Sequence, residues 1–422
     1  MIYALILFAI TYVLMLTFSK YRPYIALASA LVFILTGMLP LDQIFTAIDW
    51  NVLLMIAGTM GLVQLFIDSH MPARLADMIM TKVPNVQMAA VALALFAGII
   101  SAFVDNVATV LMVAPVALAI CKKLNTNPVP FIIGIAVSSN LQGAATLVGD
   151  TTAIMLGSYA DMSFLDFFWY KGRPGIFFAV ELGAVASALI LAWLFRKEKK
   201  PIDRATQLTP VTDYVPTVLL AGMIVLLISA SFLPSKPDIT NGLICVTLFV
   251  IGMVYTYVRT RKTEAFTGPI KSIDFETIGL LLGLFLVIGG ITHMGVVDAA
   301  AGLLAKMGGG NVFLIYTVIV WASVLFSAFI DNIPYVATML PVVTGLASTL
   351  GIDPTLLYFG LLSGATLGGN MTPIGASANI AGIGILRREG YEVKTGDFCR
   401  IGIPFTLAAV VPAYIYFWVL FA

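Results

Sequence analysis

The chain consists of long apolar runs separated by short polar connectors. Most runs approach the roughly 20 apolar residues that a helix needs to cross a bilayer. They cover residues 2–19, 23–40, 50–68, 86–121, 131–157, 174–195, 214–233, 239–258, 273–293, 311–348, 355–385 and 401–421. The runs at 86–121 and 311–348 are each long enough for two helices, with an Asp-Asn pair near the middle. Shorter amphipathic pieces at 71–85 and 296–308 precede them, and we expect these to be interfacial connectors.

The two Asp-Asn segments are copies of one another. Residues 101–115, SAFVDNVATVLMVAP, align with residues 327–341, SAFIDNIPYVATMLP, at an offset of 226 residues. The same offset aligns GAATLVGDTTAI at 143–154 with GNMTPIGASANI at 369–380. Two motifs that share one offset indicate a duplicated unit.

The duplication predicts the domain organisation. We expect a first repeat over residues 1–196, a cytoplasmic linker over 197–213 and a second repeat over 214–422. Each repeat would contain a re-entrant hairpin, at 86–121 and 311–348, and a broken transmembrane helix, at 131–157 and 355–385. The predicted fold is an all-α polytopic membrane protein.

The basic residues predict the orientation of the repeats. If the N-terminus is outside and each long run enters and leaves on one face, 19 Lys and Arg residues lie inside. Only four lie outside, namely Lys171, Arg173, Lys236 and Lys306. This bias predicts about ten full crossings, both termini outside and two repeats of opposite topology. Inverted repeats are typical of secondary transporters, whose binding sites lie near the midplane between the repeats.

Composition supports a membrane protein and disfavours several other classes. The 422 residues are 60% hydrophobic and 11% charged, whereas soluble proteins carry about 25% charged residues. Three distant cysteines give no disulfide framework and no metal spacing. Residues 2–18 lack a basic start and a cleavage site, which favours a retained helix over a signal peptide. No nucleotide-binding loop and no nucleophile–base set is present, so we expect no enzyme activity, no cofactor and no nucleic-acid partner.

Asp105 and Asp331 are the strongest candidates for chemistry. A carboxylate within the hydrocarbon costs several kcal/mol, so an intramembrane acid indicates function by default. The structural alternative is a helix-capping pair at the hairpin tip, where Asp and Asn accept backbone N–H bonds. Capping and ion binding are compatible, and the acid occurs in both repeats. We therefore include Asp105, Asn106, Asp331 and Asn332 in the predicted site, where they could also bind sodium.

The second pair of motifs indicates helices broken within the membrane. Gly and small hydroxyl residues interrupt both apolar runs, and a broken helix is tolerated there only where it lines a cavity or is buried in protein. A simple kink is the structural alternative. Asp150 and Asn379 have Ala376 and Ala153 at the equivalent positions, so the two repeats differ here. The predicted binding residues from these motifs are Thr146, Gly149, Asp150, Thr372, Gly375, Ser377 and Asn379.

Asp105, Asp150 and Asp331, gathered at one site, would suit a proton-coupled carrier. Such a carrier must gain and lose a proton near neutral pH, and carboxylates gathered in a low-dielectric site meet that need. Glu181, which has no counterpart in the second repeat, and His293 are weaker candidates, and their participation stays open.

These motifs resemble the arsenite-efflux and sodium–proton antiporter permeases of the ion transporter superfamily, including the P-protein branch. The resemblance covers nearly the whole chain and rests on SAFVDN, SAFIDN, TLVGD and GNMTPIGASAN. It implies that hairpin tips and broken helices form the substrate and ion sites. Relatives that import dicarboxylates with sodium have Ser-Asn-Thr at the tips, where this chain has Asp105-Asn106-Val107 and Asp331-Asn332-Ile333.

The resemblance implies a function and a location. The first expectation is proton-coupled efflux of arsenite, antimonite or a similar small inorganic solute. Sodium–proton antiport and sodium-coupled carboxylate transport are the alternatives, and a passive channel is the alternative of a different class. We expect an integral protein of a bacterial or archaeal plasma membrane, in contact with lipid. A homodimer and an ATPase partner stay open.

Overall fold

The computed structural model describes residues 1–201, 208–233 and 236–422. Residues 202–207 of the predicted linker therefore lie outside the described residues, as do residues 234–235. Apart from one two-stranded hairpin, the regular structure of the described part is helical.

The helices of the first half begin and end close to the apolar runs of the sequence. They are α1 (Ile2–Thr17), α2 (Arg22–Leu35), α3 (Ile44–Ala47), α4 (Trp50–Asp68), α5 (Met71–Met80), α6 (Val86–Ser101), α7 (Asn106–Leu124), α8 (Val129–Gly143), α9 (Thr151–Tyr159) and α10 (Ile176–Leu194). Strands β1 (Trp169–Tyr170) and β2 (Arg173–Pro174) form an antiparallel pair between α9 and α10.

The second half repeats the order of the ten helices, and its described residues contain no counterpart of β1 and β2. Its helices are α11 (Val215–Ala230), α12 (Thr240–Thr260), α13 (Glu264–Lys271), α14 (Phe275–His293), α15 (Val296–Gly308), α16 (Val312–Ser327), α17 (Asn332–Leu350), α18 (Thr355–Gly368), α19 (Ser377–Arg388) and α20 (Thr395–Phe421). Short 3-10 helices cover Ser19–Tyr21, Leu41–Gln43, Leu165–Phe167 and Gly369–Met371.

Each long apolar run folds as two helices, as the Asp-Asn pair predicts. α6 ends at Ser101 and α7 begins at Asn106, and the Asp105 carboxylate caps α7 by accepting the N–H groups of Val107 and Ala108 at 3.0 and 3.1 Å. In the second half, Asp331 caps α17 by accepting the N–H of Ile333 at 3.2 Å. We call α6–α7 the first hairpin and α16–α17 the second hairpin.

The two predicted broken helices are also divided. α8 ends at Gly143 and α9 begins at Thr151, while α18 ends at Gly368 and α19 begins at Ser377. The residues just before α9 and α19, Asp150 and Ala376, have extended backbones with φ of −143° and −144°. The same backbone geometry therefore interrupts both helices.

The two halves pack against each other in matching ways. α4 of the first half contacts α12 of the second, α14 of the second contacts α2 of the first, and α10 packs along α20. Glycines allow the close approach: a Cβ at Gly58 would lie 2.5 Å from the Cys245 carbonyl carbon, and one at Gly283 would lie 2.6 Å from that of Ala26. The halves are thus interleaved rather than placed side by side as separate domains.

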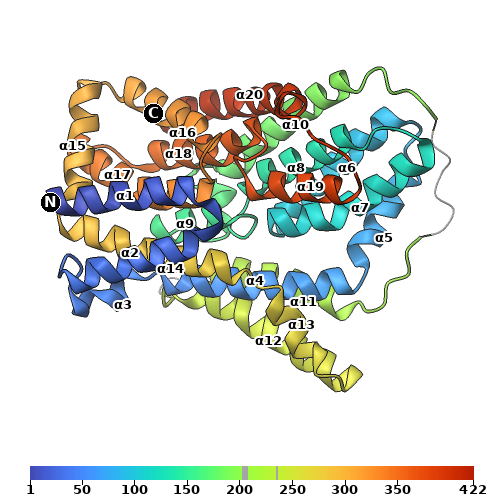
Figure 1. The fold of residues 1–422 in the computed structure, drawn as a ribbon, viewed down its shortest axis with the longest axis horizontal. Helices are drawn as coiled ribbons and strands as arrows, with labels where there is room; N and C mark the ends of the chain where they lie inside the picture. Colours follow the sequence, from blue (N-terminus) through green and yellow to red (C-terminus); the bar gives the residue numbers. More distant parts are fainter. Residues whose placement is uncertain (202–207, 234–235) are drawn as a thin grey trace.

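The hairpins and broken helices lie along one side of the molecule in Figure 1, together with α10 and α20. Helices α4 and α11–α14 lie along the other side. Both termini lie toward the end of the molecule that carries α3 and α15, whereas α5 and residues 195–201 after α10 lie at the opposite end (Figure 1).

Helix lengths support fewer complete crossings than the ten expected. In the described part, seven helices are long and apolar enough to span a membrane, or eight if α15 and α16, bent by 118°, count as one broken span. Several apolar helices are shorter, namely Ile2–Thr17, Arg22–Leu35, Val86–Ser101, Val129–Gly143 and Val215–Ala230. The shortness of the hairpin arm α6 and of α8 follows from the Asp-Asn turn and the Gly-Thr interruption. The shortness of α1 and α2 was not predicted.

Candidate functional site

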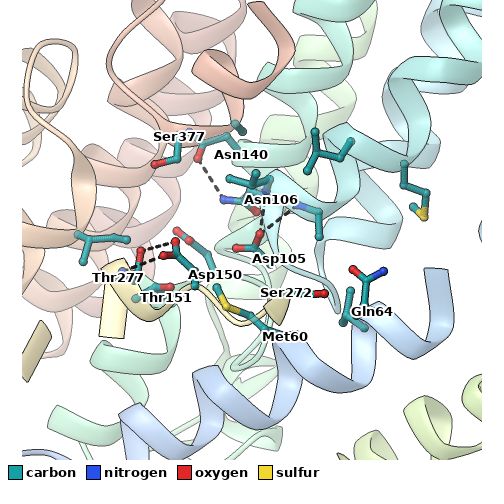
Figure 2. Close-up of a pocket in the computed structure, with 18 of the residues that line it drawn as sticks. Met60, Gln64, Asp105, Asn106, Asn140, Asp150, Thr151, Ser272, Thr277 and Ser377 are labelled. Atoms are coloured by element: carbon teal, nitrogen blue, oxygen red, sulfur yellow. Dashed lines mark hydrogen bonds between the residues drawn. The ribbon is translucent and has the colours of Figure 1, made fainter. Parts of the chain in front are cut away.

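The hairpin tips and the helix interruptions surround a cavity of about 450 Å³. Its polar lining comes from Asp105 and Asn106 of the first hairpin, Asn332 of the second, Asp150 and Thr151 at the start of α9, Asn140 of α8 and Ser377 of α19. α4 contributes Met60, Val63, Gln64 and Ile67, and the segment around the start of α14 contributes Ser272, Asp274 and Thr277. Figure 2 shows the Asp105 and Asp150 side chains in the same cavity, with Asn140 and Ser377 above them and Met60 and Gln64 below.

Asp105 has one carboxylate oxygen that the helix cap does not use. Oδ1 accepts the two backbone N–H groups at the start of α7, whereas Oδ2 makes no hydrogen bond to the described residues. The residue is partly exposed and lines the cavity. Asp105 therefore serves as a helix cap and still presents an oxygen to a ligand.

Asp150 is almost fully buried, with an exposed fraction of 6%. Its Oδ2 accepts the Thr152 hydroxyl at 2.5 Å and lies 3.4 Å from the Asn332 amide nitrogen of the second hairpin. Among the described residues, neither Asp105 nor Asp150 forms an ion pair with a basic side chain. A carboxylate as buried as Asp150 is costly to keep charged without a cation beside it, so this arrangement favours the binding of a proton or another cation.

A chain of buried amides connects the first hairpin to the second half. The Asn106 amide nitrogen donates to Asn140 Oδ1 at 3.2 Å, and the Ser101 hydroxyl donates to Asn106 Oδ1 at 2.7 Å. Asn140 then donates to the Thr366 carbonyl at 2.7 Å and to Asn370 Oδ1 at 3.1 Å. These bonds fix the amides beside the cavity, and a satisfied buried network of this kind rigidifies a site.

The threonines and glycines of the broken helices attach them to the hairpin tips. The Thr146 hydroxyl donates to the Ala102 carbonyl, and Thr372 donates to Ala328 in the same way. A Cβ at Gly149 would lie 2.8 Å from the Ser101 carbonyl oxygen, and one at Gly375 would lie 2.8 Å from that of Ser327. Each interruption therefore packs directly on its own hairpin turn.

The structure divides the predicted residues into two groups. Five line the cavity: Asp105, Asn106, Asp150, Asn332 and Ser377. Six do not: Thr146, Gly149, Asp331, Thr372, Gly375 and Asn379. Asn379, fully buried, donates to the Gly369 and Thr372 carbonyls at 3.0 Å and so supports the second interruption.

Sequence reasoning missed six polar residues of the lining: Gln64, Asn140, Thr151, Ser272, Asp274 and Thr277. Asn140 had a signal, since VSSNLQG places an amide within an apolar run. Gln64 and Thr277 had none, because their helices meet the hairpins only in three dimensions. Glu181 and His293 lie outside this cavity, and His293 lines a different one.

That second cavity, of about 770 Å³, corresponds to the first through the sequence repeat. Leu111 of α7 lines the first cavity, and Ala337 of α17, 226 positions later, lines the second. In α4 and α14 the capping acids Asp49 and Asp274 are 225 positions apart. At that offset the residues of α4 in the first cavity correspond to residues of α14 in the second: Met60, Val63, Gln64 and Ile67 to Phe285, Ile288, Gly289 and Thr292. The first cavity reaches the hairpin tips, whereas the lining of the second does not include Asp331 or Asn332.

Paired hairpins and interrupted helices around a polar cavity in an apolar, polytopic chain define a membrane transport protein. The chain belongs to the citrate transporter (CitMHS) family, whose family model matches residues 5–361 and, in a second match, residues 243–422. It is an integral membrane protein and a secondary transporter of this family, not an enzyme.

Curated relatives match much of this chain in sequence, and a solved structure shares its fold. An uncharacterized transporter of Mycobacterium tuberculosis is 30% identical over 98% of this chain and 97% of its own length. The human P protein is 29% identical over 74% of this chain and 46% of its own length. The crystal structure of the Alcanivorax borkumensis YdaH transporter matches with a TM-score of 0.61 at 14% identity, over 89% of this chain and 87% of that one, which shows a common fold.

Proposed function

We propose that this protein is a secondary active transporter in which Asp105 and Asp150 bind the coupling cation and the cavity between the hairpin tips holds the transported solute. The observation that carries the proposal is that Asp105 at a hairpin tip and the buried Asp150, neither with a basic partner among the described residues, line one cavity of about 450 Å³. The amides of Asn106, Asn140 and Asn332 supply donors and acceptors for a polar solute.

The charge of the lining restricts the cargo. Asp105, Asp150 and Asp274 line the cavity, and no Lys, Arg or His is among its described lining residues. Like charges disfavour one another strongly at low dielectric, so a free polyanion is repelled unless cations accompany it. A neutral solute, a cation or a cation-bound anion is favoured.

Two kinds of cargo meet this requirement. Arsenite and antimonite are neutral hydroxides at pH 7, in keeping with the resemblance to arsenite-efflux permeases. Citrate, the substrate in the family's description, would need an accompanying cation, and the amides and the Ser377 hydroxyl could then bind its carboxylates. We place a neutral hydroxide first and a cation-bound carboxylate second. The family description favours the carboxylate, but the acidic lining requires that a cation be carried along with it.

The coupling ion is either a proton or sodium. Sodium prefers hard oxygen ligands, which the Asp105 carboxylate and the Asn106 and Asn332 amides can provide. A proton needs only one of the acids. Sodium–proton antiport, with no organic or arsenic cargo, would use the same residues.

The two repeat-related cavities support a carrier rather than a channel. We propose that the two cavities are the access routes from opposite membrane faces. In this structure the first cavity reaches the hairpin tips and the second does not. In this proposal both hairpins are re-entrant. The interrupted helices α8–α9 and α18–α19 each count as one of ten crossings, and both termini lie outside. A bacterial or archaeal plasma membrane and a homodimer belong to the same proposal.

The test is flux into proteoliposomes that contain the purified protein, under an imposed pH or sodium gradient. Arsenite, sodium, citrate and citrate with a divalent cation are compared at equal concentrations. Gradient-driven, saturable movement of at least one of them supports the proposal and identifies the cargo. Unitary conductance steps in planar bilayers, without gradient-driven accumulation, would instead show a channel.

A further inference from the structure

The second hairpin is attached to the N-terminal helices by an ion pair that the sequence did not predict. The Arg22 guanidinium at the start of α2 donates to Asp331 Oδ2 at 3.2 Å, and the two side chains are 19% and 10% exposed. The basic-residue pattern placed Arg22 in an inner loop. Its guanidinium reaches the second hairpin tip, and its Nε donates to the Met15 carbonyl of α1 at 3.4 Å.

The neighbouring helix makes a second attachment to the same hairpin. The Tyr12 hydroxyl of α1 donates to the Pro334 carbonyl in the first turn of α17 at 2.6 Å, and it also contacts the Thr338 hydroxyl. The short α1–α2 unit thus contacts the second hairpin at its capping acid and along the helix that this acid caps.

The equivalent acid of the first hairpin has no such partner. Asp105 forms no ion pair with a basic side chain of the described residues, and its Oδ2 accepts no hydrogen bond from them. Asp331 Oδ2, by contrast, accepts from both Arg22 and the Ser377 hydroxyl, each at 3.2 Å.

Helix packing identifies the counterpart of Arg22. α2 packs on α14 where Gly283 meets Ala26, and α12 packs on α4 where Gly58 meets Cys245. Four residues before Ala26 is Arg22, and four residues before Cys245 is Asn241. Asn241 has no charge, so the repeats differ in this ion pair as well as at Asp150.

We propose that Arg22 is a positioning residue that neutralises Asp331 and fastens the second hairpin to α1–α2, leaving Asp105 and Asp150 as the acids that bind the coupling cation. This inference rests on the proposed transport function. The Asp331 carboxylate is buried, so its charge must be balanced, and Arg22 provides that balance. The same pairing keeps Asp331 from acting as an ion ligand while the hairpin is in this position.

The test compares Arg22→Gln, Asp331→Asn and the double variant in proteoliposomes. Each single change leaves one charge without its partner, and breaking a buried pair from one side costs more than removing both charges. We expect each single variant to lower the maximal transport rate by about tenfold or more, equal to ~1.4 kcal/mol. The double variant should recover to within about threefold of the native rate, with an unchanged dependence on the coupling cation.

The control is Lys20→Gln, which removes a positive charge from the same turn without touching Asp331, and it should keep the native rate. A double variant as inactive as Asp331→Asn, yet equally stable, would show that Asp331 itself binds ion or solute and would overturn the inference. Equal losses of transport rate in Lys20→Gln and Arg22→Gln would also overturn the inference. The loss would then follow from removing any positive charge in this turn, and not from breaking the contact with Asp331.

Thermal unfolding in detergent separates this inference from the transport proposal. The proteins compared are the native protein, Arg22→Gln, Asp331→Asn and the double variant. A double-mutant cycle with clear non-additivity would show that Arg22 and Asp331 stabilise each other even if no tested solute is transported. Additive changes in unfolding temperature would overturn the pairing whatever the flux assay shows.

Discussion

Asn140 of α8 donates its side-chain amide to the main-chain carbonyl of Thr366 in α18 at 2.7 Å, and the two residues are 226 positions apart. This separation equals the offset of the sequence repeat, so equivalent positions of the two halves touch. Only residues close to a pseudo-two-fold axis can do so. The axis therefore passes beside the cavity, and the difference between Asn140 and Thr366 makes its two sides chemically distinct.

The first prediction concerns the acid at the first hairpin tip. Asp105→Asn should leave a folded protein, because Asn caps a helix about as well as Asp. Gradient-driven transport should fall by at least about tenfold, since an amide can neither bind a proton nor neutralise a cation. Initial uptake rates in proteoliposomes under a pH or sodium gradient measure this effect.

Asp353→Asn is the matched control. Asp353 also accepts a backbone N–H at a helix start, from Thr355 at 2.9 Å, but it lies outside the first cavity and pairs with Lys171 at the surface. Exposed pairs contribute little, so its uptake rate should stay close to native. Full gradient-driven uptake by Asp105→Asn would leave Asp105 as a helix cap only.

The second prediction concerns access to the two cavities. In a background without the three native cysteines, Val107→Cys should react with a membrane-impermeant thiol reagent from the face that carries α5, because Val107 lines the first cavity. Ala337→Cys should react from the opposite face, because Ala337 lines the second cavity. Transported solute should slow the labelling of Val107→Cys by occupying the cavity.

Labelling of sealed vesicles from each side separately provides the measurement. Ile251→Cys is the control, since Ile251 is an exposed apolar residue within α12 and should face lipid. Equally rapid labelling of Val107→Cys from both faces under all conditions would contradict a one-sided cavity.

The third prediction concerns the second helix interruption. A Cβ at Gly375 would lie 2.6 Å from the Gly369 carbonyl oxygen and 2.8 Å from that of Ser327. These are backbone atoms, so the hairpin and the interruption must separate. Gly375→Ala should therefore lower stability by about 1–3 kcal/mol and reduce transport, as seen by thermal unfolding in detergent and by uptake.

Gly384→Ala is the matched control within α19. A Cβ there meets no heavy atom within 4 Å, and alanine favours a helix over glycine by about 0.5–1 kcal/mol. The Gly384→Ala variant should therefore unfold at an unchanged or slightly higher temperature than the native protein. A similar loss in both variants would show that α19 tolerates no added methyl group, rather than that the interruption is tightly packed.

The fourth prediction concerns the linker. Its ends are attached to the first half: the Gln87 N–H donates to the Glu198 carbonyl at 2.8 Å, and the Thr209 N–H donates to Asp77 Oδ2 at 2.8 Å. Residues 1–205 and 206–422, expressed together as separate chains, should retain transport because the cut leaves both attachments intact. Co-purification of the two fragments and their uptake rate measure this.

Deleting residues 198–201 should be more harmful than the cut, since the Lys200 carbonyl accepts the N–H of Val86 at the start of α6, at 3.0 Å. We therefore expect the ends of the linker, which contact the first half, to matter more for transport than continuity of the chain between residues 205 and 206. Complete loss of activity in the split protein, with both fragments inserted, would contradict the prediction that the two halves assemble into an active protein without a covalent link.

The sequence identified most of the elements because their signals are local. Apolar runs set the helices, and the Asp-Asn pairs and Gly-Thr interruptions mark where α6, α16, α8 and α18 end. The short elements α3, α13 and the β1–β2 hairpin were missed, because a few residues carry too little periodicity. The polar role of Asn140 was missed for a different reason: its partners, Asn106 and Asn370, come from other segments.

By itself, the sequence determined the class of protein, the duplication and the positions of the acids, since hydropathy and a fixed offset are properties of the chain. Only the tertiary structure decided how the two acids of the hairpin tips differ. Asp105 lines the cavity, whereas Asp331 pairs with Arg22, and no local pattern could show that, because Arg22 lies 309 residues away. The charge environment of a residue depends on which segments pack around it, and that is set by the fold as a whole.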